Sequence, residues 1–480
     1  MNIRNEVPLW INGKEVYTEN KFDNADPYTS EIICEVSTPD NFLIEEAIES
    51  AQKAQKEWAN YSAKKRAKIL RKAAHHLEEL NDEIALVETI DTGRPIRETS
   101  CVDIVSSVDC LNYMASQIET LGSRHQNLEG NQFFFTINKP LGVCLGIGAW
   151  NYPIQIATWK SAPALAMGNS FIFKTSENAP VSALYLAEAY QKAGLPDGLF
   201  QVIHGHGEIG SQLVSHPSIK KVSLTGSVET GKKVFQDASL SFKKTSLELG
   251  GKGPLIIMED ANLHGAVQSA MLANFYSQGE ICSNGTRVFV HENILDRFTS
   301  LLKEETQKII AGDPKNPETH LGPIINKKQI TKIQNFIALA KDEGATVYQP
   351  YPQSGNIIPP TILTNCSDHM NCVRHEIFGP VMSVLGFTDK DEVIGRANNT
   401  NYGLAGAVFS ENLSAAHEIA SKLEVGVAWI NSYNLTPVEM PFGGSKDSGL
   451  GMENGIEVLR EYSRVQSIYV NSSNTYDSFF

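Results

Sequence analysis

From Val143 onward, short apolar segments alternate with segments of helical periodicity, and this alternation limits the possible folds more than any other feature of the chain. Apolar runs of three to five residues that are separated by helical stretches are typical of strands buried on both faces. Parallel strands need helical crossovers, so the pattern predicts an α/β fold with a doubly wound parallel sheet. The expected strands are 143–147, 171–173, 200–203, 222–224 and 255–258, and helices are expected at 181–193 and 231–235.

Three other regions have patterns of their own. Residues 40–120 are expected to be helical, because 45–58 and 63–80 carry apolar residues at three- and four-residue spacing. A second alternating block begins near Cys282 and ends near Val438. Its expected strands are 288–290, 381–387 and 427–430. The segment 462–470 alternates apolar and polar residues, which fits either a local edge strand or an arm that pairs with another subunit.

Length and composition exclude several classes of protein. A chain of 480 residues exceeds what one core usually supports, so two or three domains are expected. No apolar run approaches the roughly 18 residues of a membrane span, and the first residues lack the apolar core of a secretory signal. A net charge of −14 disfavours nucleic acid as a partner. Seven cysteines without paired spacing indicate reduced thiols, so a cytoplasmic protein is expected.

One cysteine and one glutamate stand in segments that favour chemistry. Cys282 is flanked by small polar residues and glycines, which would keep its thiol accessible. Glu248 ends an apolar segment and is followed by Leu249, two glycines and Lys252, so it is a candidate general base. A free thiol has a pKa of roughly 8.5, so a cysteine nucleophile needs help to become a thiolate. The two segments together predict covalent catalysis.

These two segments resemble the signature of the aldehyde dehydrogenase superfamily, and the resemblance extends from about Trp10 to Gln466. The resemblance implies a Rossmann-type parallel cofactor domain, an α/β catalytic domain and a β arm that forms a homodimer or homotetramer. The expected bounds are 1–120 and 143–255 for the cofactor domain, 256–438 for the catalytic domain, and 121–142 and 460–480 for the arm. Other matching segments are 148–153, 174–177, 225–227, 376–380 and 441–444.

The resemblance also assigns catalytic roles. Cys282 would add to the aldehyde, hydride would leave to NAD, and Glu248 would activate the water that hydrolyses the thioester. Asn151 would donate to the oxyanion, although its place before a proline fits a helix cap equally well. Lys160 and Glu453 match a proton relay, and a surface lysine with a helix-start glutamate is the alternative.

A larger set of residues would bind NAD. Glu177 would sit beside the ribose 2′ position and repel a 2′-phosphate, which favours NAD over NADP. The segment 205–210 is a literal GxGxxG, and from sequence alone it is about as good a phosphate loop as 225–231; the resemblance favours 225–231. The expected cofactor residues are Gly148, Ala149, Trp150, Lys174, Thr175, Ser176, Glu177, Gly226, Ser227, Val228, Glu229, Gly250, Glu376 and Phe378.

Four aromatic residues match positions that line the aldehyde pocket in this family. Tyr152, Trp159, Tyr276 and Phe442 would suit a quaternary ammonium group through cation–π attraction, or they are ordinary core residues. The surrounding segments look most similar to betaine aldehyde and trimethylaminobutyraldehyde dehydrogenases, whose reaction would yield glycine betaine or a longer analogue. Such enzymes also bind K+ or Na+ through a residue that matches Asp91 and through the backbone near positions that match Asn24, Ala25 and Asn178.

Several alternatives remain open. The rival substrates are other small or ω-amino aldehydes, and the rival classes are a CoA-acylating enzyme, a cysteine-dependent esterase and a non-catalytic protein on the same scaffold. Glu280 replaces the glutamine that is usual two residues before the nucleophile, and an acid there could raise the pKa of Cys282. Met452 and Thr175 are the other departures from the pattern.

Overall fold

The first of two large sheets has eight strands in the order β22-β12-β11-β8-β9-β10-β2-β3. The computed structural model describes residues 4–473. The five central strands run parallel, and β22 and β2 join their two edges in the antiparallel sense. The strands are β2 (Leu9–Ile11), β3 (Lys14–Val16), β8 (Val143–Ile147), β9 (Ser170–Lys174), β10 (Phe200–Ile203), β11 (Ile219–Thr225), β12 (Lys244–Glu248) and β22 (Gly449–Leu450).

The central strands are buried on both faces, as the apolar runs predict. In β9, Phe171 and Phe173 join one core cluster, whereas Ile172 points into the cluster on the other face. Helices α1, α8 and α9 cover the Ile172 face, and α2, α5, α6 and α7 cover the other. The helices of this half are α1 (Asn41–Trp58), α2 (Ala63–Glu79), α3 (Asn81–Thr92), α4 (Ile96–Thr99), α5 (Asp103–Thr120), α6 (Pro153–Ala166), α7 (Ala183–Lys192), α8 (Gly207–Ser215) and α9 (Val228–Ser239).

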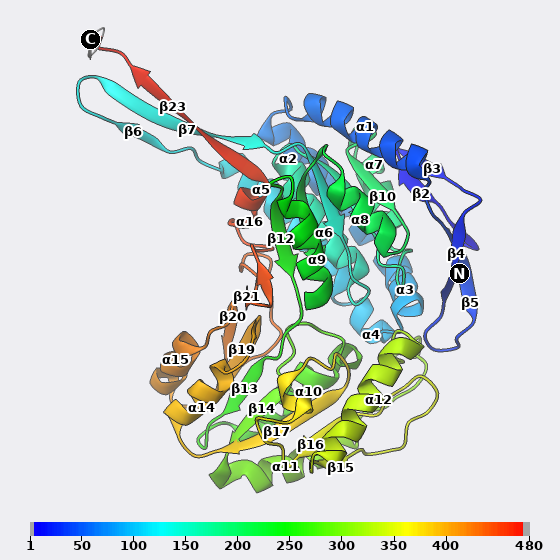
Figure 1. The fold of residues 1–480 in the computed structure, drawn as a ribbon, viewed down its shortest axis with the longest axis vertical. Helices are drawn as coiled ribbons and strands as arrows, with labels where there is room; N and C mark the ends of the chain where they lie inside the picture. Colours follow the sequence, from blue (N-terminus) through cyan, green and yellow to red (C-terminus); the bar gives the residue numbers. More distant parts are fainter. Residues whose placement is uncertain (1–3, 474–480) are drawn as a thin grey trace.

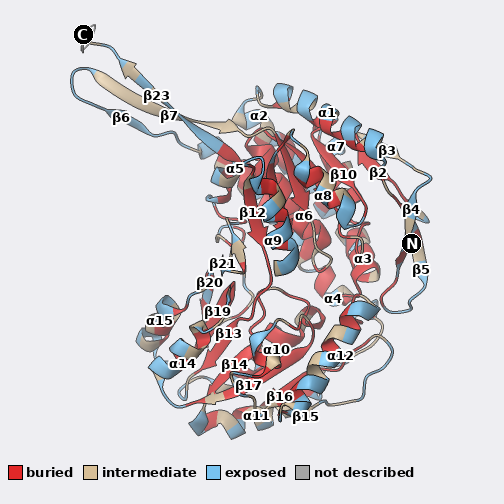
Figure 2. Cartoon of the chain, in the orientation of Figure 1, coloured by how far each residue is buried: buried red, intermediate tan, exposed pale blue. Residues whose placement is uncertain are grey.

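The second large sheet has seven strands in the order β15-β16-β17-β14-β13-β19-β20, all parallel except β15. Its strands are β13 (Pro254–Ile257), β14 (Arg287–His291), β15 (Thr346–Tyr348), β16 (Thr361–Thr364), β17 (Val381–Phe387), β19 (Ala405–Phe409) and β20 (Val427–Ile430). The helices are α10 (Leu263–Phe275), α11 (Glu292–Thr306), α12 (Lys327–Asp342), α13 (Asn371–Arg374), α14 (Lys390–Asn398) and α15 (Leu413–Lys422). The later α16 (Val458–Glu461) packs against α6 of the first half. The strands of both sheets are largely buried, and exposed residues lie mainly on the outer helices (Figure 2).

A three-stranded antiparallel sheet extends away from the body of the molecule (Figure 1). It consists of β6 (His125–Asn127), β7 (Gln132–Pro140) and β23 (Ser463–Asn471). β23 pairs with β7 along its whole length, so the alternating segment 462–470 is a strand with a partner in its own chain. Residues 474–480 of the expected arm lie outside the described residues.

The smaller strands complete the fold. β1 (Glu6–Val7), β5 (Ile32–Ser37) and β4 (Lys21–Ala25) form one sheet, and β18 (Tyr402–Gly403) pairs with β21 (Ser445–Lys446). Among residues 4–473, no helix has the length and apolar character needed to cross a membrane. The mixed α/β class and the parallel sheets expected from the sequence are confirmed.

Candidate active site

Cys282, Glu248 and Asn151 border one cavity of about 1110 Å³. Glu248 is the last residue of β12, and Asn151 lies in the loop between β8 and α6. Cys282 follows the short 3-10 turn η1 (Tyr276–Gly279). Two of the three residues therefore lie at the carboxyl ends of parallel strands, where open α/β sheets commonly bind ligands.

Asn151 does not cap helix α6. The helix begins at Pro153, and Tyr152 occupies the cap position without a side-chain hydrogen bond. The Asn151 amide instead donates a hydrogen bond of 2.9 Å to the backbone carbonyl of Glu280. The cap interpretation was wrong because the proline occupies the first helical position, which leaves Asn151 one residue too early to cap.

The turn before Cys282 has a left-handed backbone. Ser277, Gln278 and Gly279 have φ values of 48°, 55° and 71° in succession. Left-handed backbone costs about 1–2 kcal/mol for each residue that carries a Cβ atom. A Cβ atom on Gly279 would lie 2.3 Å from the backbone of Gly379, so only glycine fits there. Surrounding contacts must therefore hold this turn in place.

The Cys282 thiol is not activated by its own surroundings. Burial, and then the carboxylates of Glu248 and Glu376, raise its pKa to about 12. The thiol is therefore protonated near neutral pH, and a base must remove its proton before it can attack a carbonyl carbon. Glu280, the unusual residue two positions earlier, is itself buried, and burial raises the pKa of its carboxyl to about 8. It is mostly neutral at pH 7, like the glutamine it replaces.

Glu248 is a buried carboxyl that keeps its proton to a higher pH than usual. Burial, and then the charge of Glu453, raise its pKa well above the usual range, while Lys160 opposes the shift. Neither carboxyl oxygen of Glu248 has a hydrogen-bond partner among the described residues.

Lys160 and Glu453 form a buried ion pair whose charges act on Glu248. The Lys160 ammonium donates to Glu453 Oε1 at 2.6 Å and to the Ser223 hydroxyl at 2.9 Å. Both side chains are at most 3% exposed, so Lys160 is not a surface lysine. Glu453 pairs with Phe442 in a β-bridge before α16, so it is not the helix-start glutamate of the alternative interpretation.

Most of the expected cofactor residues border the same cavity. They include Lys174, whose ammonium lies 3.6 Å from Glu177 Oε2. Two expected residues do not border it. The Thr175 hydroxyl is buried against the His204 ring at 2.8 Å, and Val228 packs against the apolar core. The expected residues that do border it are Gly148, Ala149, Trp150, Lys174, Ser176, Glu177, Gly226, Ser227, Glu229, Gly250, Glu376 and Phe378.

Glu376 and Phe378 are held tightly on the cavity wall. The backbone N–H of Gly251 donates to Glu376 Oε1 at 3.0 Å, and a Cβ atom on Gly250 would lie 2.2 Å from the other oxygen. Phe378 has a φ of 59°, which is rare for a bulky residue and typical of functional sites. Its ring meets the Trp150 ring edge to face, with centroids 5.7 Å apart.

The sequence interpretation missed part of the cavity wall. Gly207, Gly210 and Ser211 border it together with the 225–231 loop, so both candidate phosphate loops face the same space. The GxGxxG pattern was the signal for the first loop. Gln329 and Lys332 of α12 also border the cavity, and nothing in their local pattern distinguishes them from other helical residues.

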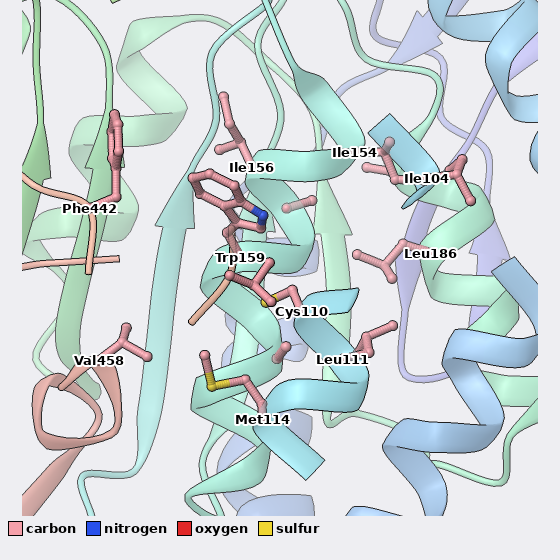
Figure 3. Close-up of a cluster of buried hydrophobic side chains, with 14 of the residues drawn as sticks. Ile104, Cys110, Leu111, Met114, Ile154, Ile156, Trp159, Leu186, Phe442 and Val458 are labelled. Atoms are coloured by element: carbon pink, nitrogen blue, oxygen red, sulfur yellow. The ribbon is translucent and has the colours of Figure 1, made fainter. Parts of the chain in front are cut away.

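The four aromatic residues do not border this cavity. Trp159 packs edge to face on Phe442 at 6.1 Å, within a cluster of buried apolar side chains (Figure 3). The Arg94 guanidinium lies 3.9 Å above the Tyr152 ring, so one face of that ring already holds a cation. Tyr276 begins the η1 turn directly before Ser277, whose hydroxyl lies 2.9 Å from the Tyr152 hydroxyl, so it belongs to the same neighbourhood.

The residues expected to bind a monovalent cation are only partly brought together. Asn24 donates to one oxygen of Asp91, and the backbone N–H of Val181 donates to the other at 3.0 Å. Burial raises the pKa of Asp91 to about 7. Among the described residues, the hydrogen bonds of Asp91 do not include Asn178, whose side chain accepts from Asn326 at 3.1 Å. Within residues 4–473, no cluster of three His, Cys, Asp or Glu side chains is suited to a metal ion.

Comparison with known proteins agrees with this geometry. The model of the "Aldehyde dehydrogenase family" matches residues 10–468. The chain belongs to the aldehyde dehydrogenase family. A betaine aldehyde dehydrogenase of Vibrio vulnificus is 48% identical over 470 residues, covering 96% of this chain and 97% of that protein. One of Brucella anthropi is 50% identical over 454 residues, covering 92% of each.

Solved structures of the family have the same fold. The betaine aldehyde dehydrogenase of Staphylococcus aureus in complex with NAD+ is 34% identical with a TM-score of 0.96, covering all of this chain and 97% of that one. The NAD+ complex of a Bacillus cereus aldehyde dehydrogenase is 35% identical with a TM-score of 0.95, covering 98% and 100% of the two chains. These matches confirm the expected family, fold and enzyme class.

Proposed function

We propose that this aldehyde dehydrogenase oxidises betaine aldehyde, or a longer trimethylammonium aldehyde, to the carboxylic acid with NAD. The observation that carries the proposal is one cavity that joins Cys282, Glu248 and Asn151 to the ribose-side residues Lys174 and Glu177. The names of the Vibrio and Brucella relatives support the substrate. A cavity of about 1110 Å³ has room for a dinucleotide beside the nucleophile.

Cys282 is the proposed nucleophile, and its thiol adds to the aldehyde carbon to form a thiohemiacetal. Asn151 and the Cys282 backbone N–H would donate to the oxyanion, and one such donor is typically worth about 3 kcal/mol of transition-state stabilisation. NAD, when bound, supplies the hydride acceptor. The enzyme must then hydrolyse the resulting thioester.

Glu248 is the proposed base for that hydrolysis. Its two unpartnered oxygens and raised pKa suit a carboxyl that takes up a proton from water. Glu453 has one unpartnered oxygen and a salt bridge to Lys160, so it could receive the proton next. We assign Lys160 and Glu453 to this relay, because both are buried and the charges of both act on Glu248.

Glu177 supports NAD rather than NADP. Its side chain is 42% exposed at the cavity and is paired with Lys174, so it can reach a ribose hydroxyl. A carboxylate there would repel a 2′-phosphate. The 225–231 loop, at the start of α9, is the proposed pyrophosphate site.

The arm supports an oligomer. The sheet of β6, β7 and β23 projects from the body, and β23 has mostly exposed side chains, including Val465 and Tyr469. We infer that it packs against another copy of the chain in a homodimer or homotetramer. The proposed division is 1–120 with 143–255 for the cofactor, 256–438 for catalysis, and 121–142 with 460–480 for the arm. Seven free cysteines support a reducing cytoplasm.

A K+ or Na+ ion would fit Asp91. Its carboxylate is fully buried, and within the described part of the chain it accepts only from the neutral donors Asn24 and Val181. An ion held by Asp91, with the backbone near Asn24, Ala25 and Asn178, would offset that buried charge. K+-dependent thermal stability that disappears in Asp91→Asn is the expected result.

The proposed chemistry is tested by following NADH after mixing protein, NAD and betaine aldehyde. Cys282→Ala should form no NADH while binding NAD normally, and substantial NADH would refute the nucleophile. Glu248→Gln should give a burst of NADH before a slow steady state, because hydrolysis slows more than oxidation. Comparing kcat/KM for trimethylammonium aldehydes with kcat/KM for ω-amino aldehydes decides between these two substrate classes.

A further inference from the structure

A buried charged network lies next to the turn that carries the nucleophile. Arg94, in the loop between α3 and α4, is 2% exposed. Its Nη1 atom donates to both carboxyl oxygens of Asp103, at 2.9 and 2.8 Å. Its Nε atom donates to the Ser277 hydroxyl at 3.2 Å, and its guanidinium plane covers the Tyr152 ring. Arg94 therefore joins α5 to the nucleophile turn and to the loop before α6.

The Ser277 hydroxyl has all of its hydrogen-bonding capacity in use. It donates to Glu98 Oε2 at 2.8 Å and accepts from Arg94. The Tyr152 hydroxyl is 2.9 Å away and, since the single Ser277 hydrogen is used by Glu98, it is the donor in this pair. The backbone N–H of Ser277 also donates to Glu98, at 3.3 Å. Four bonds thus converge on one left-handed residue.

These bonds connect the two parts of the proposed oxyanion site. Tyr152 directly follows Asn151, and Ser277 lies five residues before Cys282. A second connection, from Asn151 to the Glu280 carbonyl, joins the same two segments further along. The strained turn and the Asn151 loop are therefore held against each other at two places.

We propose that Ser277 and Arg94 are positioning residues that set the alignment of Cys282 with Asn151. The inference rests on the proposed roles of those two residues. Ser277 holds the left-handed turn, and Arg94 holds Ser277 while keeping Tyr152 in place. A lysine could not replace Arg94, because one ammonium group cannot span Asp103 and Ser277 with the same fixed planar geometry.

The test compares Ser277→Ala with Ser161→Ala, which removes a matched buried bond of 2.9 Å between a serine and a tyrosine, Tyr190. Ser277→Ala should slow NADH formation in the first turnover, measured with enzyme in excess over aldehyde and called the burst rate here, about 10- to 100-fold, the cost typical of a misplaced reacting group. The rate at which iodoacetamide alkylates Cys282, measured as a function of pH, should also differ from that of the parent protein. The Kd for NAD should stay within about twofold, because no residue of the network borders the cofactor cavity.

Arg94→Lys should lower the burst rate in the same way, and Ser277→Gly should do so even though glycine relieves the left-handed backbone. Ser277→Gly also keeps the test available if Ser277→Ala folds poorly. A burst rate within about twofold of the parent in both Ser277 variants, or an equal loss in Ser161→Ala, would overturn the proposal. Turnover by Cys282→Ala would instead refute the proposed function itself.

Discussion

The side-chain nitrogen of Asn151 lies 2.9 Å from the backbone carbonyl oxygen of Glu280 and donates a hydrogen bond to it. An amide nitrogen carries two hydrogens, so this bond uses one and fixes the direction of the other. The Asn151 side chain is 6% exposed and borders the cavity beside Cys282. The second N–H is therefore available as a preoriented donor, which is the arrangement that oxyanion stabilisation requires.

Replacing Asn151 should therefore lower the rate of catalysis more than it lowers the stability of the fold. Asn151→Ala removes the proposed oxyanion donor and should lower kcat about 100- to 1000-fold, with NAD affinity nearly unchanged. Steady-state kinetics and NAD titration measure the two effects. Asn151→Asp keeps the shape without the donor, so it should lose as much activity. An aspartate variant with nearly full activity would show that the donor is not needed.

The buried pair of Lys160 and Glu453 should show strong energetic coupling. Lys160→Met leaves Glu453 buried without its cation, and such losses typically cost about 3–5 kcal/mol of unfolding free energy. Lys160→Met/Glu453→Leu should recover most of that loss, as urea denaturation would show. Lys232 and Asp447 form an exposed pair, and Lys232→Met is the control that should change stability by less than about 1 kcal/mol. Additive effects of the two core substitutions would contradict the coupling.

The sequence allowed the central strands to be predicted because burial on both faces produces uninterrupted apolar runs. Residues 143–147, 200–203 and 381–387 were predicted with the bounds that the structure shows. The helix at 231–235 was predicted too short, since α9 runs from Val228 to Ser239 with many exposed polar residues. Periodicity marks the buried stripe of a helix rather than its ends.

The site could be predicted only where the residues lie in recognisable segments. Cys282, Glu248 and Asn151 were found in this way, and the structure brings them to one cavity. Thr175 and Val228 belong to the same segments as residues that line the cavity, but their side chains point towards the core. The direction of a side chain depends on tertiary packing, which the local sequence does not specify. The hydrogen-bond network around Arg94 could not be predicted from the sequence, because it joins residues that lie far apart in the chain.

Glu280 should make stability depend on pH. Burial raises the pKa of its carboxyl to about 8, whereas in the unfolded chain it is about 4.3. Between these values the folded protein keeps a proton that the unfolded chain releases, so stability falls as pH rises towards 8. Glu280→Gln removes this titration. Its melting temperature should exceed that of the parent by a margin that grows from about pH 5 to 8 and then stays constant.

The matched control for this experiment is Glu46→Gln, at an exposed position on α1. It should shift the melting temperature little at any pH in the same range. A constant difference between Glu280→Gln and the parent from pH 5 to 8 would mean that Glu280 keeps an ordinary pKa. The departure from glutamine would then place a charged group beside the nucleophile at neutral pH.

The role of the aromatic residues can be tested by comparing a cationic aldehyde with a neutral aldehyde of the same shape. Trp159 and Phe442 pack together, and a hydrogen bond of 3.0 Å from the Trp159 indole to Ser106 fixes the ring. Tyr152 already has Arg94 on one face, so at most its other face can meet a substrate cation. Because none of the four rings borders the cavity beside Cys282, a cation–π contact with Trp159 requires the ammonium end of the substrate to reach past that cavity to the ring. Such a contact is worth up to about 2 kcal/mol or more when desolvated.

A trimethylammonium aldehyde should therefore be preferred by kcat/KM over the neutral aldehyde that carries a tert-butyl group, because the two differ in charge and little in shape. Trp159→Ala should penalise the cationic substrate more than the neutral one, whereas Trp159→Phe keeps an aromatic face and should preserve part of the preference. The net charge of −14 adds a long-range attraction that salt screens, so the preference must be measured at high ionic strength as well. Equal efficiency on the two aldehydes, or an equal penalty from Trp159→Ala, would mean that these rings only line an apolar pocket.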